Sequence, residues 1–170
     1  DMGYDTEVNV QDGALNICTG SMSGTYQYVS SLIADSNDTL GNMNMSTVQS
    51  AGSIENLQLL TQGACNLAIV QKDALEEFNS TDHGYELEKT SPIYKEFAHL
   101  VCNSKSRVSK LRDINQRTKI AIGPENSGSD LTFNKLREMQ SDLKMANTKN
   151  MSYEIAMKAL VGDDSVEEKV

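Results

Sequence analysis

The sequence predicts an α/β protein with parallel strands joined by helices, and three observations carry this prediction. Short apolar runs alternate with segments in which apolar residues recur at helical spacing, in the order strand, helix, strand, helix, strand, helix over residues 14–78. A loop rich in glycine and hydroxyl residues joins a strand to a helix twice, at residues 19–25 and 123–129. No apolar run approaches the roughly 18 residues that a membrane-spanning helix needs. Such alternation implies parallel strands with right-handed helical crossovers.

Elements of the first half follow from local patterns. Apolar positions 26, 29, 32 and 33 have the spacing of one helix face, and Ser53 followed by Glu55 resembles a helix start. In chain order we expect a strand at 14–18, a helix at 26–34, a polar loop at 35–46, a strand at 45–50, a helix from Ser53 that ends at Gly63, a strand at 65–70, a helix at 73–78 and a loop at 79–90.

The second half repeats the strand, loop and helix order of the first. The polar stretch at residues 103–107 is a candidate link between domains, which predicts a first lobe over residues 1–103 and the start of a second over 104–170. The predicted elements are a long strand at 93–102, a short helix at 108–114, a strand at 119–122, a helix at 130–139, a helix at 153–160 and an acidic, solvated end.

Charge excludes two classes of partner. The 170 residues carry 15 Lys and Arg against 24 Asp and Glu, a net charge of −9, which argues against binding to nucleic acid or to an anionic membrane surface. The chain begins Asp1-Met2-Gly3 and has neither an initiator methionine nor a basic leader. We therefore expect a processed chain from which a signal peptide has been removed.

Cysteines and histidines offer little chemistry. Cys18, Cys65 and Cys102 form no C-x-x-C pair, so a zinc ribbon or a thioredoxin-type site is unsupported. All three lie in apolar runs, which favours buried thiols, and a Cys18–Cys65 bridge in an oxidising compartment is the alternative. His83 and His99 are expected to be solvated or packed. The acidic end lacks the spacing of a calcium loop, so we expect neither a metal nor a cofactor.

The two glycine loops carry the functional argument. The first N–H groups of a helix have no partner inside it, and small residues let a ligand approach them, so an anion or a carbonyl oxygen can bind there. Gly123 and Gly128 are followed by Ser129 rather than Lys, which excludes a Walker loop, and the glycines do not form a dinucleotide fingerprint.

Four strings together resemble a known family. They are Ile17 to Tyr26 (ICTGSMSGTY), Gly52 to Leu57 (GSIENL), Leu67 to Asp73 (LAIVQKD) and Gly123 to Ser129 (GPENSGS). Their order and spacing are similar to those of the TAXI family of TRAP-transporter solute receptors, over residues 14–161. The resemblance implies a type II periplasmic-binding-protein fold, in which two α/β lobes close on a solute in the cleft between them.

The resemblance also implies a function and a set of contacts. It describes a periplasmic or extracytoplasmic receptor without catalytic activity that binds a small polar solute, carboxylate-bearing and similar to an amino acid or organic acid, and delivers it to the membrane permease subunits of a TRAP-type transporter. The implied ligand contacts are Thr19, Gly20, Ser21, Ser23, Gly24, Thr25, Tyr26, Ser53, Gln71, Pro124, Ser127, Gly128 and Ser129.

Departures and alternatives accompany the resemblance. The family usually carries an acidic residue where Asn66 stands, and it continues beyond Gly162 with further strands and helices, so we expect an incomplete second lobe. An ABC-importer binding protein or a ligand-sensing regulatory domain of the same fold are alternative functions. A third is an enzyme that uses Cys18 as its nucleophile, because that residue lies beside the first glycine loop.

Overall fold

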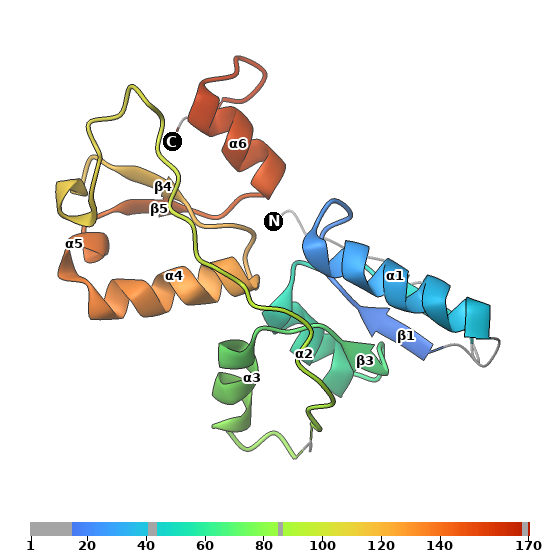
Figure 1. The fold of residues 1–170 in the computed structure, drawn as a ribbon. Helices are drawn as coiled ribbons and strands as arrows, with labels where there is room; N and C mark the ends of the chain where they lie inside the picture. Colours follow the sequence, from blue (N-terminus) through green and yellow to red (C-terminus); the bar gives the residue numbers. More distant parts are fainter. Residues whose placement is uncertain (1–14, 41–43, 85–86, 168–169) are drawn as a thin grey trace. The chain divides into compact units, whose positions relative to one another are not determined.

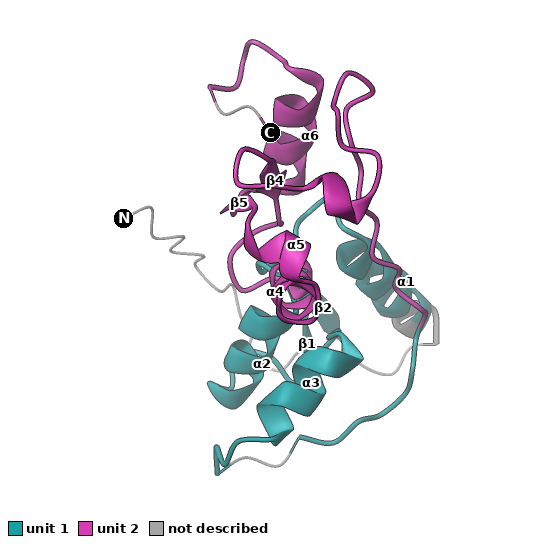
Figure 2. Cartoon of the chain, turned by 90° about the vertical axis from the view of Figure 1, so that its left-hand side faces the viewer, with its two compact units in different colours: residues 1–93 teal, residues 94–170 magenta. Residues whose placement is uncertain are grey.

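The chain divides into two compact units, Asp1–Ile93 and Tyr94–Val170 (Figure 2). The computed structural model describes residues 15–40, 44–84, 87–167 and 170. The N-terminal residues, the first position of the strand predicted at 14–18 and Glu168 of the acidic end lie outside this range. The boundary between the units follows Ile93, the first residue of the strand predicted at 93–102, whereas the boundary predicted from the sequence follows residue 103.

Unit 1 contains a parallel sheet, as predicted. Its strands are β1 (Leu15–Cys18), β2 (Met45–Val48) and β3 (Leu67–Ala68), in the order β2-β1-β3. In the central strand, Ile17 pairs with Thr47 on one side and with Leu67 on the other. Residues 16–18 of β1 are buried. The central strand is therefore buried along most of its length, including the polar residue Asn16.

Three helices accompany this sheet. They are α1 (Thr25–Leu40), which joins β1 to β2, α2 (Ser53–Thr61), which joins β2 to β3, and α3 (Lys72–Asn79), which follows β3 (Figure 1). The prediction of a loop at 35–46 is wrong for residues 35–40, which continue α1. That stretch has no apolar periodicity, but it also contains no glycine or proline before Gly41, so nothing in it stops a helix that has already formed.

A disulfide lies in the core of unit 1. Cys18 and Cys65 are bonded, with Cα atoms 5.8 Å apart, and they pack with Val48 and Leu59. The prediction of three buried thiols is therefore wrong, because two cysteines form the alternative bridge and the third, Cys102, is exposed. Half-cystines bury as readily as thiols, so apolar flanks do not distinguish the two states. The bridge also removes the thiolate required by the enzyme alternative at Cys18.

Unit 2 contains a second, smaller parallel sheet. Strand β4 (Lys119–Ala121) pairs with β5 (Asn147–Lys149), and Ile120 lies opposite Thr148. The helical elements are α4 (Gly128–Met139), α5 (Ser141–Lys144), α6 (Tyr153–Val161) and a short 3₁₀ turn, η1 (Leu111–Asp113), where a longer helix is predicted. The buried core comprises Ile114, Ile120, Ile122, Leu143 and Ala146. Strand β5 is polar and largely exposed, so its sequence carries no strand pattern.

The strand predicted at 93–102 does not form. Within the described ranges this segment belongs to neither sheet, and its large side chains face solvent, with Phe97 74% exposed. A strand requires hydrogen-bonding neighbours as well as apolar residues, and none of the described strands supplies them here. The apolar alternation of the segment therefore predicts only half of what a strand needs.

Candidate functional site

The strand order of unit 1 indicates which residues lie at the carboxyl ends of its three strands. The chain leaves the central strand β1 for β2 on one side and then crosses to β3 on the other. In open α/β sheets, ligands bind beyond the carboxyl ends of the strands at such a switch point. The residues that follow β1, β2 and β3 there are the loop 19–24, the turn 49–52 and the segment 69–71.

The loop after β1 combines a fixed base with an exposed tip. Thr19 is fully buried, and its hydroxyl lies 2.7 Å from Gln27 Oε1 and 3.0 Å from the Val48 carbonyl oxygen. Ser23 and Thr25 are exposed, and Ser21 is half-buried. Thr19 therefore anchors the loop, while the other three hydroxyls are the ones that a ligand can reach.

Glycines shape this loop differently. A Cβ at Gly24 would lie 3.0 Å from Ser21 Oγ and 3.1 Å from the Ser21 carbonyl oxygen, a tight contact, whereas a Cβ at Gly20 would meet Tyr26 Cβ at 3.7 Å and Tyr26 Cδ2 at 3.8 Å, an ordinary contact. The turn therefore favours glycine at position 24. Gly20 is buried together with Thr19, so it belongs to the base of the loop.

Three predicted contacts meet at the start of α2. Ser53 is buried, its Oγ accepts a hydrogen bond from the Gln71 backbone N–H at 3.0 Å, and the Tyr26 hydroxyl lies 3.2 Å from the same oxygen. Ser53 comes from α2, Tyr26 from α1 and Gln71 from the end of the β3 segment. The structure therefore brings together residues that are 45 positions apart, since 71 − 26 = 45.

Asn56 connects the strand ends below this group. It is fully buried, its Nδ2 donates to the carbonyl oxygens of Thr19 (2.6 Å) and Ile69 (2.8 Å), and its Oδ1 accepts from Ser50 Oγ (2.5 Å). One amide thus ties together the chain after β1, β2 and β3. This role of Asn56 is not among the predicted contacts, although an Asn three residues after Ser53 on an otherwise apolar helix face is a usable signal.

The second glycine loop caps α4. Ser127 is buried, and its Oγ accepts a hydrogen bond from the Asp130 N–H at 3.2 Å, which makes it the N-cap. Gly128 is buried, and Pro124 and Ser129 are half-buried. The Ser129 hydroxyl lies 2.9 Å from the hydroxyl of Tyr153, a residue that the sequence analysis assigned only to a helix face. Ser129 is therefore the more accessible of the two loop hydroxyls.

Gly123 fixes the entry into this loop. Its φ is +85°, and a Cβ there would lie 3.0 Å from Ser129 Cβ and 3.3 Å from a Tyr153 ring carbon. The Asn150 amide donates to the Gly123 carbonyl oxygen at 3.2 Å. Backbone conformation and crowding both require glycine at this position.

We expect Gly123→Ala to lower the free energy of unfolding of unit 2 by more than the roughly 1–2 kcal/mol that a left-handed residue costs in backbone strain alone. Gly162→Ala is the matched control, because Gly162 has φ +77° with open space around it. Denaturant unfolding of both variants gives the difference between them. Equal losses would contradict the crowding around residue 123.

Comparison with protein families identifies the chain. The model of the NMT1-like family matches residues 17–164, which covers both glycine loops. The chain belongs to the NMT1-like family. This is a family of the periplasmic-binding-protein type, with an α/β fold and a solute-binding function, so a small molecule is the ligand. No curated protein matches the chain.

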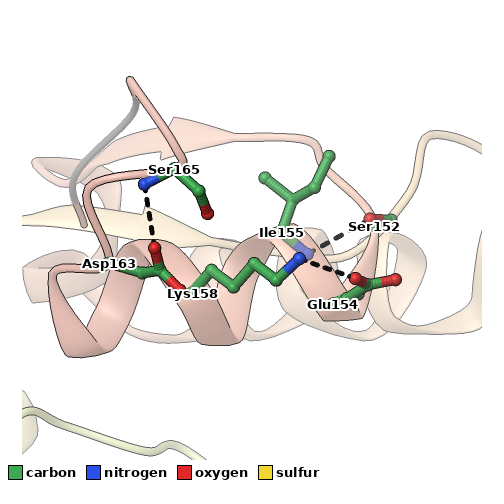
Figure 3. Close-up of polar contacts among 6 residues, drawn as sticks. All are labelled: Ser152, Glu154, Ile155, Lys158, Asp163 and Ser165. Atoms are coloured by element: carbon green, nitrogen blue, oxygen red, sulfur yellow. Dashed lines mark hydrogen bonds and ion pairs between the residues drawn. The ribbon is translucent and has the colours of Figure 1, made fainter.

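An ion pair lies on α6, the helix whose first residue contacts the second loop. At the start of α6, Ser152 caps the Ile155 N–H at 3.3 Å, and Lys158 Nζ lies 2.8 Å from Glu154 Oε1 (Figure 3). The hydrogen bond from Lys158 and its charge lower the pKa of Glu154, and the same contact raises the pKa of Lys158. This lysine is therefore engaged with its neighbour, and the candidate contacts are all uncharged.

Other features of this NMT1-like chain lie apart from the loops. A cavity of about 390 Å³ between α2 and α3, lined by Leu57, Ala74 and Phe78 among others, contains none of the predicted contacts. In the part of the chain that the structure describes, no helix is long and apolar enough to cross a membrane, and no cluster of three His, Cys, Asp or Glu is arranged to hold a metal ion. The cavity is mostly apolar, whereas the two loops offer hydroxyls and backbone N–H groups.

Proposed function

We propose that this NMT1-like chain is the solute receptor of a TRAP-type transporter, similar to the TAXI receptors. Its ligand is a small polar molecule that bears a carboxylate and resembles an amino acid or an organic acid. The receptor works outside the cytoplasm, delivers the solute to membrane permease subunits and carries out no chemical reaction. The four motifs that resemble the TAXI receptors and the family match over both glycine loops support this proposal.

One observation carries the choice of the loops as the binding region. Tyr26, Ser53 and Gln71 are distant in the sequence but meet at the carboxyl edge of the unit 1 sheet, where open α/β sheets bind ligands. Unit 2 places Ser129 at the start of α4, where N–H groups without helical partners favour an anionic group. The contacts are neutral donors, which suit a carboxylate held without a charged partner.

The disulfide supports the location. Cys18–Cys65 bridges form and persist in oxidising compartments such as the periplasm, and are rare in reducing ones. A neighbouring gene for a TRAP membrane subunit would support the transport assignment. A gene that fuses this domain to an output domain would instead support the regulatory alternative.

Amide NMR spectra recorded during titration with succinate, acetate and L-alanine test the binding region. We expect saturable shifts in the amides of residues 20–26 and 123–129, and none with ethanolamine, which lacks a carboxylate. Saturable shifts confined to the cavity between α2 and α3 would overturn the assignment of the loops. The absence of binding by all three carboxylates would overturn the proposed ligand class.

We expect Thr25→Ala to weaken binding of the best of these three probes roughly 2- to 12-fold, the range that one lost neutral hydrogen bond produces. Thr25 is exposed at the first position of α1, so its hydroxyl is available to the solute. Thr61→Ala is the control, because the Thr61 hydroxyl bonds to the Gln58 carbonyl oxygen at the far end of α2. Isothermal titration calorimetry measures both, and equal affinities of the two variants would argue against Thr25 as a contact.

A further inference from the structure

Tyr153 lies beside the second glycine loop although it is 24 residues beyond Ser129. It is the first residue of α6, which follows β5, and β5 is parallel to β4. Helices that follow neighbouring parallel strands begin at the same edge of the sheet. The Tyr153 hydroxyl is 2.9 Å from Ser129 Oγ, and its ring lies against Gly123, where a Cβ would come within 3.3 Å of a ring carbon.

Unit 1 has the same arrangement made from different elements. Tyr26, the second residue of α1, places its hydroxyl 3.2 Å from Ser53 Oγ at the first residue of α2. In both units a tyrosine in the first turn of one helix therefore contacts a serine in the first turn of another. The sequences around the two pairs are unrelated, so the likeness belongs to the edge of the sheet and not to a repeat.

The hydroxyl pair in unit 2 has a hydrogen to spare. Ser129 and Tyr153 carry one hydroxyl hydrogen each, and the contact between them uses one of the two. Tyr153 is 47% exposed, so the remaining hydrogen is available to a group from outside the protein. A partner for it must be a hydrogen-bond acceptor, and oxygen is the acceptor that a polar organic solute carries.

We propose that Tyr153 is a solute contact of unit 2, acting with Ser129 as a hydroxyl pair that donates to a carboxylate or carbonyl oxygen of the solute. This inference rests on the proposed function and adds to it a residue that is not among the contacts implied by the resemblance to the TAXI receptors. The ring of Tyr153 covers Gly123, so the aromatic side chain also sets how much room the solute has above the loop.

The test uses the whole chain labelled with ¹³C in its six tyrosines, with the signal of Tyr153 assigned from its loss in Tyr153→Phe. We expect succinate to shift the Tyr153 ring signals saturably. We expect Tyr153→Phe to weaken succinate binding roughly 2- to 12-fold with an unchanged thermal midpoint, since the ring is retained. Tyr28→Phe is the matched control, because Tyr28 is an exposed tyrosine on α1 outside the proposed contacts.

The remaining arms separate the possible outcomes. Because Ser129 and Tyr153 act as a pair, the double variant Ser129→Ala with Tyr153→Phe should bind succinate with nearly the affinity of the single variant that binds it more weakly. Succinamide in place of succinate distinguishes a carbonyl oxygen from a carboxylate as the acceptor. Succinate that shifts the loop amides while leaving the Tyr153 ring signals and the affinity of Tyr153→Phe unchanged would overturn this inference and leave the proposed function standing. If succinate, acetate and L-alanine all fail to bind, both the inference and the proposed ligand class are overturned.

Discussion

Replacing both Cys18 and Cys65 with alanine should lower the free energy of unfolding of unit 1 by about 4 kcal/mol. The bridge joins residues 47 positions apart, and closing a loop of that length restricts the unfolded chain by about this amount in the chain-entropy account. Both residues are also buried beside Val48 and Leu59, so no solvation gain offsets the loss. Hydrogen exchange of the β1 and β3 amides in increasing denaturant measures the effect on this unit.

Two controls accompany the disulfide experiment. Cys102→Ala should change the free energy of unfolding by no more than about 0.5 kcal/mol, because Cys102 is exposed and unbonded. Reduction of the unsubstituted protein with dithiothreitol should reproduce most of the loss seen in the double variant. A double variant as stable as Cys102→Ala would show that the bridge does not form in solution.

The disulfide lies directly before the loop 19–24. Cys18 immediately precedes Thr19, and the loop 19–24 begins where the disulfide holds the end of β1 against the chain that enters β3. The disulfide holds the last residue of β1, and the Asn56 amide binds the carbonyl oxygens of Thr19 after β1 and Ile69 after β3. The loop 19–24 is therefore held at its base by a covalent bond and by hydrogen bonds, which favours a preformed loop.

Local patterns predicted the parts of the fold that depend on local chemistry. The loops at 19–25 and 123–129 are recognisable because glycine and hydroxyl residues between an apolar run and a helical period are sufficient to form a strand, turn and helix start. The parallel pairing follows from the helical crossovers between strands. The family resemblance implies Ser53 and Gln71 as ligand contacts, and the strand order places the two residues within hydrogen-bond distance of each other.

Features that depend on residues far apart in the sequence were not predicted. Residues 93–102 have the composition of a strand but no described strand beside them, while the polar residues 147–149 form β5 because β4 offers a free edge. Cys102 has apolar neighbours like Cys18, yet only Cys18 has another cysteine within reach. In each case the outcome depends on what lies opposite in space, which a pattern along the chain does not contain.

Asn56→Asp should destabilise unit 1 by at least about 3 kcal/mol at pH 7. The substitution keeps the shape of the side chain but replaces the amide donor that reaches the Thr19 and Ile69 carbonyl oxygens with an oxygen. Each buried carbonyl left without its donor costs about 1–3 kcal/mol, and a carboxylate in this fully buried position adds a desolvation cost. Denaturant unfolding followed by hydrogen exchange of the β1 amides measures the loss.

Asn66→Asp is the matched control for this substitution. Asn66 is exposed and uses its Oδ1 to accept the Asn16 N–H at 2.9 Å, a role that a carboxylate fills equally well. We expect its effect to stay within about 0.5 kcal/mol.

The pH dependence of the stability of Asn56→Asp separates the effect of the introduced charge from the effect of the lost amide donor. The two carbonyl oxygens that face the introduced carboxyl disfavour its charged form, so its pKa in the folded protein lies above the ordinary value of about 3.9. The folded state then binds the proton more tightly than the unfolded state, and stability falls as pH rises from about 4 through the raised pKa. The deficit relative to the unsubstituted protein should therefore be smallest below about pH 4 and grow toward pH 7. A deficit that is the same at both pH values would contradict the raised pKa, and the loss would then come from the missing amide donor and not from the charge of the carboxylate.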